Sequence, residues 1–96
     1  MTLNTKQKSY LRGLAHKLKP VVMIGNAGVT EGVINEIQSS LQHHELIKIR
    51  ISGMDRPERL ATIDEICAQA GGDLVTTIGH IAVLYRKADK PRIKLP

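Results

Sequence analysis

The sequence predicts an α/β (α+β) fold whose elements follow the order α-β-α-β-α-β-β. Three stretches have apolar residues at helical spacing, and four short runs rich in Val and Ile lie between and after them. The last two runs are joined by Gly79-His80, a two-residue hairpin signal. Strand–helix–strand units pair in parallel through right-handed crossovers, and a hairpin adds an antiparallel strand. We therefore expect a four-stranded mixed sheet with helices packed on it.

The composition indicates one small domain that spans residues 1–96. Hydrophobic residues make up 42% of the chain, but Trp and Phe are absent, so the core must be aliphatic. The single Cys67 excludes an internal disulfide and a multi-cysteine zinc site. Because no apolar run has the length of a membrane span or a signal segment, we expect a soluble, cytoplasmic protein without a membrane partner.

The first predicted helix begins at Asn4 or Thr5, one of which caps it, and runs to about Leu18, because Pro20 disfavours helical structure at the residue before it. Its expected buried stripe is Leu11, Leu14, Ala15 and Leu18. A second stripe beside it is basic: Lys8, Arg12, His16 and Lys19. Such a stripe is usually a solvated face, but the lack of any acid here favours a polyanionic partner. Gly13 weakens the helix by about 1 kcal/mol relative to Ala.

Residues 20–24 form an apolar run that predicts a buried strand, and Gly25-Asn26-Ala27-Gly28 follows it directly. Thr30 then caps a second helix, with Glu31 in its first turn. The buried stripe expected for that helix is Val33, Ile34, Ile37 and Leu41. Two glycines before a helix N-terminus allow backbone N–H groups to approach an anion such as a phosphate. The alternative is that the glycines only form a turn, and the loop lacks the further residues of the dinucleotide and P-loop motifs.

The first helix and this loop could form one surface. If the helix folds back antiparallel on strand 20–24, its N-terminal half, with Lys6, Lys8 and Arg12, returns toward the glycine loop. We therefore expect basic side chains and loop amides to bind the same partner.

The middle of the chain begins with a polar connection, His43-His44-Glu45. We expect no metal there, because adjacent histidines point in different directions and no third ligand is suitably spaced. The strand that follows, Leu46–Ile51, places three isoleucines on one face, and Lys48 and Arg50 on a face that is wet or meets nucleic acid.

The remaining elements are a third helix, a hairpin and a tail. Asp55 is the expected cap of the third helix, Pro57 fits its first turn, and Gly71-Gly72 ends it. Its expected buried stripe is Leu60, Ile63, Ile66, Cys67 and Ala70, which makes Cys67 an inert core residue. The hairpin strands are Leu74–Ile78 and Ile81–Tyr85, and the second is apolar on both faces, as an interior strand would be. Residues 87–96 form a basic tail that we expect to be mobile.

The charge pattern indicates a surface patch. The chain has a net charge of +5, with the basic excess in residues 1–28 and 86–96, whereas most acids lie in residues 29–85. A basic excess confined to two segments favours a patch that binds a polyanion.

Three separated segments together resemble a known family. Leu18–Thr30, His43–Lys48 and Ile81–Arg86 are similar to landmarks of the CRM domain (chloroplast RNA splicing and ribosome maturation). The resemblance covers residues 2–88, and the stand-alone bacterial members, the YhbY-type proteins, are the nearest in length. It implies strand order 1-2-4-3, as in the C-terminal domain of translation initiation factor three.

The resemblance also implies an RNA-binding module. The loop Gly25–Gly28 would be analogous to the GxxG loop of KH domains, and bacterial members are associated with precursors of the large ribosomal subunit. Many plant domains carry Lys or Arg between the two glycines, whereas this chain has Asn26 and Ala27. The loop therefore supplies no charge, and affinity must come from the first helix and other basic residues.

We therefore expect a non-catalytic, monomeric protein that binds ribosomal RNA in large-subunit precursors, with no cofactor and no small-molecule substrate. The shortage of aromatic residues favours contact with the backbone of structured RNA over base stacking. The expected contacts are Gly25, Asn26, Ala27, Gly28, Lys6, Lys8, Arg12, Lys17 and Lys19, with Lys48, Arg50 and Arg86 as further candidates. Two alternatives remain: an adaptor that docks on ribosomal proteins, and a small phosphate-binding enzyme. The enzyme lacks support, because no carboxylate pair, nucleophile–base pair or metal cluster accompanies the loop.

Overall fold

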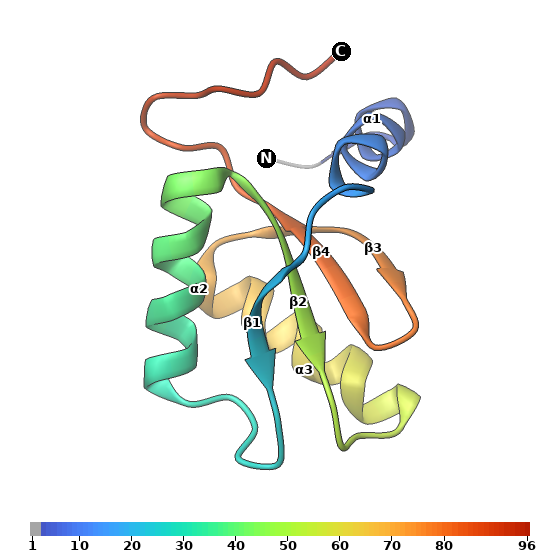
Figure 1. Cartoon of the computed structure of the whole chain (residues 1–96), viewed down its shortest axis with the longest axis vertical. Helices are drawn as coiled ribbons and strands as arrows, with labels where there is room; N and C mark the ends of the chain where they lie inside the picture. Colours follow the sequence, from blue (N-terminus) through green and yellow to red (C-terminus); the bar gives the residue numbers. More distant parts are fainter. Residues whose placement is uncertain (1–2) are drawn as a thin grey trace.

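The computed structural model describes residues 3–96 and contains the seven elements in the predicted order (Figure 1). The helices are α1 (Thr5–Ala15), α2 (Glu31–His44) and α3 (Arg56–Ala70), and the strands are β1 (Pro20–Ile24), β2 (Leu46–Ile51), β3 (Asp73–Ile78) and β4 (Ile81–Tyr85). The predicted α+β class is confirmed.

The four strands form one mixed sheet in the order β1-β2-β4-β3. β1 pairs with β2 in parallel, and β4 is antiparallel to both of its neighbours. β2 and β3 therefore run in the same direction with β4 inserted between them, which confirms that β4 is interior. β1 and β3 are the two edges of the sheet.

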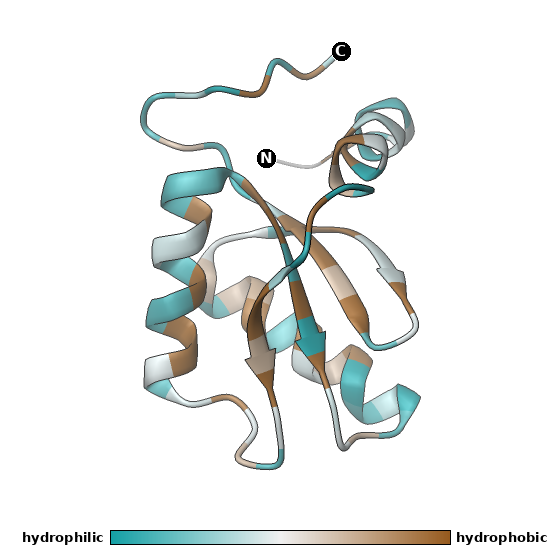
Figure 2. Ribbon diagram, viewed as in Figure 1, coloured by the Kyte–Doolittle hydropathy of each residue, from teal (hydrophilic) through white to brown (hydrophobic). Residues whose placement is uncertain are grey.

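The larger core lies on the face of the sheet that α2 and α3 cover. It combines the inward-facing isoleucines of β2 with residues of β1, β4 and the two helices: Val22, Ile24, Ile34, Ile37, Leu41, Ile47, Ile49, Ile51, Ile63, Ile66, Ala70, Ala82 and Leu84. Figure 2 shows the side of α2 that faces the sheet in brown and its outer side mostly in teal and white. Alternation along β2 thus directs its isoleucines to this core and leaves Lys48 and Arg50 for the other face.

A second, smaller core lies on the opposite face, beneath α1. Its buried members are Leu3, Leu11, Ala15, Leu46, Val75, Val83 and Tyr85, and Ile93 and Leu95 of the C-terminal segment pack against it. α1 and the C-terminal segment therefore occupy the same end of the molecule (Figure 1).

The predicted caps are confirmed. The Asn4 side chain accepts a hydrogen bond from the Gln7 N–H, and the Gln7 side-chain oxygen accepts one from the Asn4 backbone N–H, as in a capping box. Thr30 and Asp55 cap α2 and α3 in the same way. Gly71 ends α3 in the left-handed conformation at φ 73°.

Two expectations for α1 are wrong. The helix ends at Ala15, not near Leu18, because the His16 N–H donates to the Gly13 carbonyl and the Leu18 N–H to the Ala15 carbonyl in a tighter turn. Leu14 and Leu18, expected to be buried, are 42% and 38% exposed. Only Leu11 and Ala15, one helical turn apart, belong to the small core beneath the helix.

Burial also differs from expectation in β1 and α3. β1 is not fully buried, since Val21 is 46% and Met23 is 70% exposed on the face that α1 leaves open. In α3, Leu60 is 39% exposed and Cys67 is only half-buried. Val21, Met23 and Leu60 are exposed because one face of an edge strand and the first turns of a peripheral helix have no layer above them. Cys67, in the last turn of α3, instead packs against the margin of the core.

The segment between α2 and β2 differs most from the prediction, because the expected polar connection contains Glu45, whose carboxylate is fully buried. α2 continues through His44, and Glu45 ends it at a positive φ of 63° with its side chain buried. One carboxylate oxygen accepts the N–H of Arg92 at 2.5 Å and of Ile93 at 3.0 Å, and the other accepts the N–H of Ala88 at 3.1 Å. Glu45 thereby fixes the C-terminal segment to the end of α2.

These contacts determine the ionisation of Glu45. Burial opposes the charged form, but the three backbone N–H donors and the nearby Arg92 guanidinium outweigh it and hold the pKa of Glu45 below its ordinary value of 4.5. The mobility expected for residues 87–96 stays a prediction, but this segment has defined contacts with Glu45 and with the small core.

Candidate nucleic-acid interface

The glycine loop is an exposed, hydrogen-bonded turn at one end of the molecule. The Gly28 N–H donates to the Gly25 carbonyl at 3.0 Å, and Gly28 has a φ of +71°, which a side chain would disfavour. Asn26 and Ala27 are exposed at its tip. The loop opens into α2, where the Thr30 hydroxyl oxygen accepts the Val33 N–H at 3.1 Å. The Gly28 and Val33 amides are therefore already engaged within the protein, and anion binding at the other backbone amides of the loop stays a prediction.

A neighbouring turn supports this loop. The Ser52 N–H donates to the Ile24 carbonyl at 2.9 Å. The Asn26 side-chain oxygen lies only 2.6 Å from the point where a Cβ on Gly53 would stand. Asn26 therefore packs its side chain on the turn after β2, and it can meet a ligand mainly through its backbone. Gly53 is required at that place both by its φ of +78° and by this contact.

The basic residues of the first segment lie on a different part of the molecule. Lys6, Lys8, Arg12, Lys17 and Lys19 are all exposed. α1 packs on β2, β3 and β4, so it does not fold back along β1 toward the glycine loop. Figure 1 shows α1 near one end of the long axis and the loop between β1 and α2 at the other. The expected shared surface of α1 and the loop is therefore wrong in its geometry.

β2 nonetheless connects the two ends on the face that carries α1. Lys48 lies beneath α1 in a groove that Arg12 and His16 also line. Arg50 is two residues further along β2, about 7 Å toward the loop, and pairs in register with Met23 of β1. Lys48 and Arg50 thus extend the positive surface of α1 along the open face of the sheet.

Arg86 is placed differently from the other candidates. Its guanidinium donates to the Ala70 carbonyl at 2.9 Å and to the Gln38 carbonyl at 3.3 Å, and its side chain is half-buried. These bonds satisfy carbonyl groups of α3 and α2, including one at the C-terminus of α3. We therefore leave Arg86 out of the candidate surface.

Sequence reasoning missed the groove between α1 and the sheet. Its volume is about 610 Å³, and its lining residues come from α1 and its C-cap, β2, β3 and β4: Ser9, Arg12, Gly13, Ala15, His16, Lys48, Ile78 and Val83. The apolar part of this groove comes from strands that are far from α1 in sequence. The one local signal was Gly13, a glycine inside a helix with no evident role.

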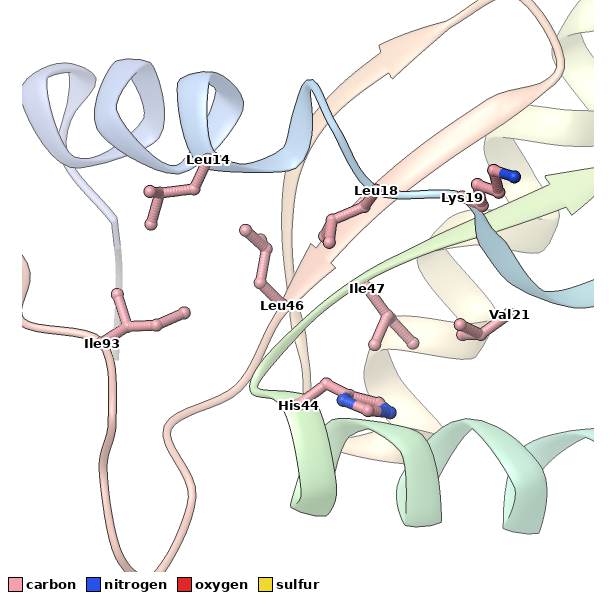
Figure 3. Close-up of a pocket in the computed structure, with 8 residues that line it drawn as sticks. All are labelled: Leu14, Leu18, Lys19, Val21, His44, Leu46, Ile47 and Ile93. Carbon is pink, nitrogen blue, oxygen red and sulfur yellow. The ribbon is translucent and has the colours of Figure 1, made fainter.

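A second hollow, of about 420 Å³, is largely apolar (Figure 3). Its lining residues are Leu14, Leu18, Lys19, Val21, His44, Leu46, Ile47 and Ile93. Figure 3 shows aliphatic side chains from α1, β1, β2 and the C-terminal segment gathered around it. Leu14, Leu18 and Val21 are among the most exposed large apolar residues of the described chain. Such a surface suits apolar side chains better than a polyanion.

Residues 3–96 contain no group of three or more His, Cys, Asp or Glu side chains placed to hold a metal ion. Burial, together with the negative charges of Asp64 and Asp73, raises the pKa of the Cys67 thiol to about 11, so little of it is thiolate at neutral pH. Within the same residues, no helix combines the length and apolar character that crossing a membrane requires.

Comparison with known proteins agrees with this architecture. A protein of Haemophilus influenzae named RNA-binding protein is 52% identical over 95 residues, which cover 99% of this chain and 96% of that protein. PA4753 of Pseudomonas aeruginosa is 43% identical over 95 residues, 99% of this chain and 91% of that protein. The solution structure of the hypothetical protein SAV1595 from Staphylococcus aureus superposes with a TM-score of 0.87 at 33% identity, covering 99% of this chain and all of that one. Residues 3–86 match the CRS1 / YhbY (CRM) domain, and the chain therefore belongs to this family.

Proposed function

We propose that this protein is a non-catalytic RNA-binding protein that contacts RNA phosphates through α1, β2 and the glycine loop. The observation that carries the proposal is the acid-free positive surface of α1, which Lys48 and Arg50 extend along the sheet. The name of the Haemophilus influenzae relative supports RNA as the partner.

We further propose that the RNA is ribosomal RNA in precursors of the large subunit, which the YhbY-type resemblance implies. This assigns the protein to the cytoplasm, where it would act as a monomer. Contacts to phosphates would position the domain on structured RNA without reading its sequence directly.

A salt titration tests the phosphate-contact model. If about five phosphates are contacted, the logarithm of the association constant should fall with the logarithm of salt concentration at a slope of about −3.5 for single strands to −4.5 for duplex RNA. A flat titration would contradict the model. Cosedimentation of the protein with large-subunit precursors, and crosslinking to RNA in cells, would test the identity of the RNA.

The apolar hollow favours a second candidate function, docking on a ribosomal protein. A partner side chain could cover Leu14, Leu18 and Val21, which are partly exposed here. Leu18→Ser should then weaken association with large-subunit precursors while affinity for isolated RNA stays at the parent value. If the variant and the parent associate equally with large-subunit precursors, docking on a ribosomal protein through this hollow is excluded.

A further inference from the structure

The groove beneath α1 is lined by polar and basic side chains at its sides and by aliphatic side chains at its base. Ser9 and Arg12 of α1 and His16, which caps its C-terminus, form one side, and Lys48 of β2 lines the groove with them. Ile78 of β3 supplies an apolar floor and is 58% exposed, whereas Val83 of β4 lies beneath it with only 1% of its surface exposed. No Asp or Glu is among the residues that line it. The groove therefore combines positive charge at its sides with an aliphatic base.

Gly13 is the feature that the fold does not explain. A Cβ at this position would meet no atom within 4 Å, and the backbone is helical, so neither packing nor φ requires glycine. Gly28, Gly53, Gly71 and Gly79 differ, since each has a positive φ. A glycine inside an exposed helix destabilises it relative to alanine. Because Gly13 lines the groove, the absence of a side chain there leaves more space inside the groove.

The shape and chemistry of the groove select its occupant. A volume of about 610 Å³ lies within the usual range for small-ligand sites. An occupant must be anionic at one end to suit Arg12 and Lys48, and must present a weakly polar face to Ile78. A nucleotide has both parts, and bases also stack on arginine guanidinium planes, so an aromatic side chain is not needed.

We propose that one unpaired nucleotide of the bound RNA inserts into this groove, with its phosphate at Arg12 and Lys48 and its base against the exposed Ile78. This inference rests on the proposed function and adds a specific site to it. The domain would then prefer RNA that offers a flipped-out or single-stranded nucleotide beside a structured region.

Substitutions at Gly13 test the proposal. Gly13→Ala should raise the melting temperature, because the helix gains intrinsic stability, yet it should weaken binding to a hairpin RNA with a single-nucleotide bulge. Gly13→Gln, a larger good helix former, should weaken binding by about tenfold, as overfilling a fitted site does. A loss of affinity that grows with side-chain size while stability does not fall is not expected from a structural defect.

Binding to the fully paired hairpin supplies the control for the same variants. Its affinity should change little on substitution of Gly13, because phosphate contacts outside the groove remain. Methyl NMR gives a direct reading: the bulged RNA should shift the Ile78 and Val83 signals, whereas inorganic phosphate and ribose 5-phosphate should not. Adenosine monophosphate should shift them only at much higher concentration than the RNA.

Two results would overturn the inference. If Gly13→Gln binds the bulged RNA like the parent while Arg12→Glu loses affinity, RNA binds on α1 without entering the groove, and the proposed function stands. If free mononucleotide shifts Ile78 and Val83 as tightly as RNA does, the groove is a mononucleotide site. If the parent binds neither RNA, the proposed function itself fails.

Discussion

The glycine loop and the α1 surface offer RNA two different kinds of attraction. The loop presents backbone dipoles at the start of α2. The acids Glu31, Asp55 and Glu58 lie in or near the first turns of α2 and α3, which begin at the same end of the molecule (Figure 1). α1 presents full positive charges with no acid among them. The segment that looks most like a phosphate-binding motif is therefore not the segment with the favourable long-range field.

This difference suggests that the two regions contribute to RNA binding in different ways. Full charges attract a polyanion over a distance of about one Debye length and are screened by salt, whereas backbone amides act only at contact. We expect α1 and β2 to supply most of the affinity and the loop to fix the position of one phosphate. The following predictions test this difference, from the largest expected effect to the smallest.

Charge reversal on α1 should have the largest effect. Arg12→Glu turns one attraction into one repulsion, each worth about 1 kcal/mol at 4 Å in water, so RNA affinity should fall by about thirtyfold. Filter binding at fixed salt would measure it. Lys90→Glu, an equal charge change at an exposed residue of the C-terminal segment, is the matched control and should cost much less. Equal losses in the two variants would mean that only net charge matters.

Glu45 should make the α1 end of the molecule sensitive to acid. Its pKa is lowered on folding, so its contribution to stability is present above pH 4.5 and is lost as the pH falls through the lower folded value. Hydrogen exchange should therefore accelerate first at Ala88, Arg92 and Ile93, while amides of the glycine loop keep their rates. Simultaneous acceleration at both ends would contradict the assignment.

Glu45→Gln isolates the same interaction at neutral pH. The glutamine oxygen can still accept the N–H groups of Arg92 and Ile93, but its amide group must face the Ala88 N–H, donor against donor. An unsatisfied buried donor costs about 1–3 kcal/mol, so the melting temperature should drop. Stability of this variant should also depend less on pH below 4.5 than that of the parent.

Ala27→Asp tests the loop with a smaller expected effect. The new carboxylate would stand near a bound phosphate and repel it by about 1 kcal/mol if the site stays solvated, which corresponds to about fivefold in affinity. Because Ala27 is exposed, the melting temperature should change little. If the variant binds RNA with the same affinity as the parent, the glycine loop does not contact RNA and serves only as a turn.

Three alanine substitutions compare the glycines of the two regions by stability alone. Gly28→Ala should destabilise by about 1 kcal/mol, since its φ of +71° disfavours a Cβ. Gly13→Ala should stabilise by about 1 kcal/mol, because it improves helix propensity at no steric cost. Gly25→Ala meets no neighbour and has no positive φ, so it should be nearly neutral. Urea titrations would rank the three.

The sequence by itself determined the elements and most of their ends. Helical spacing of apolar residues, the caps Thr30 and Asp55, the stop at Gly71 and the Gly79-His80 hairpin are local signals, and local signals act through the backbone of a few adjacent residues. The strand order 1-2-4-3 came from the family resemblance, because insertion of β4 between β2 and β3 is a choice among pairings that periodicity does not distinguish.

Only the tertiary structure decided where the elements meet. α1 lies over β2, β3 and β4 because Leu11 and Ala15 share a core with Val83 and Tyr85, residues about 70 positions away, and this separates α1 from the glycine loop. The same packing creates the groove beside Gly13 and leaves Leu14 and Leu18 exposed. Glu45 became a buried anchor because three N–H groups from a distant segment converge on it. Burial and charge environment depend on such contacts between distant segments, and short-range patterns do not encode them.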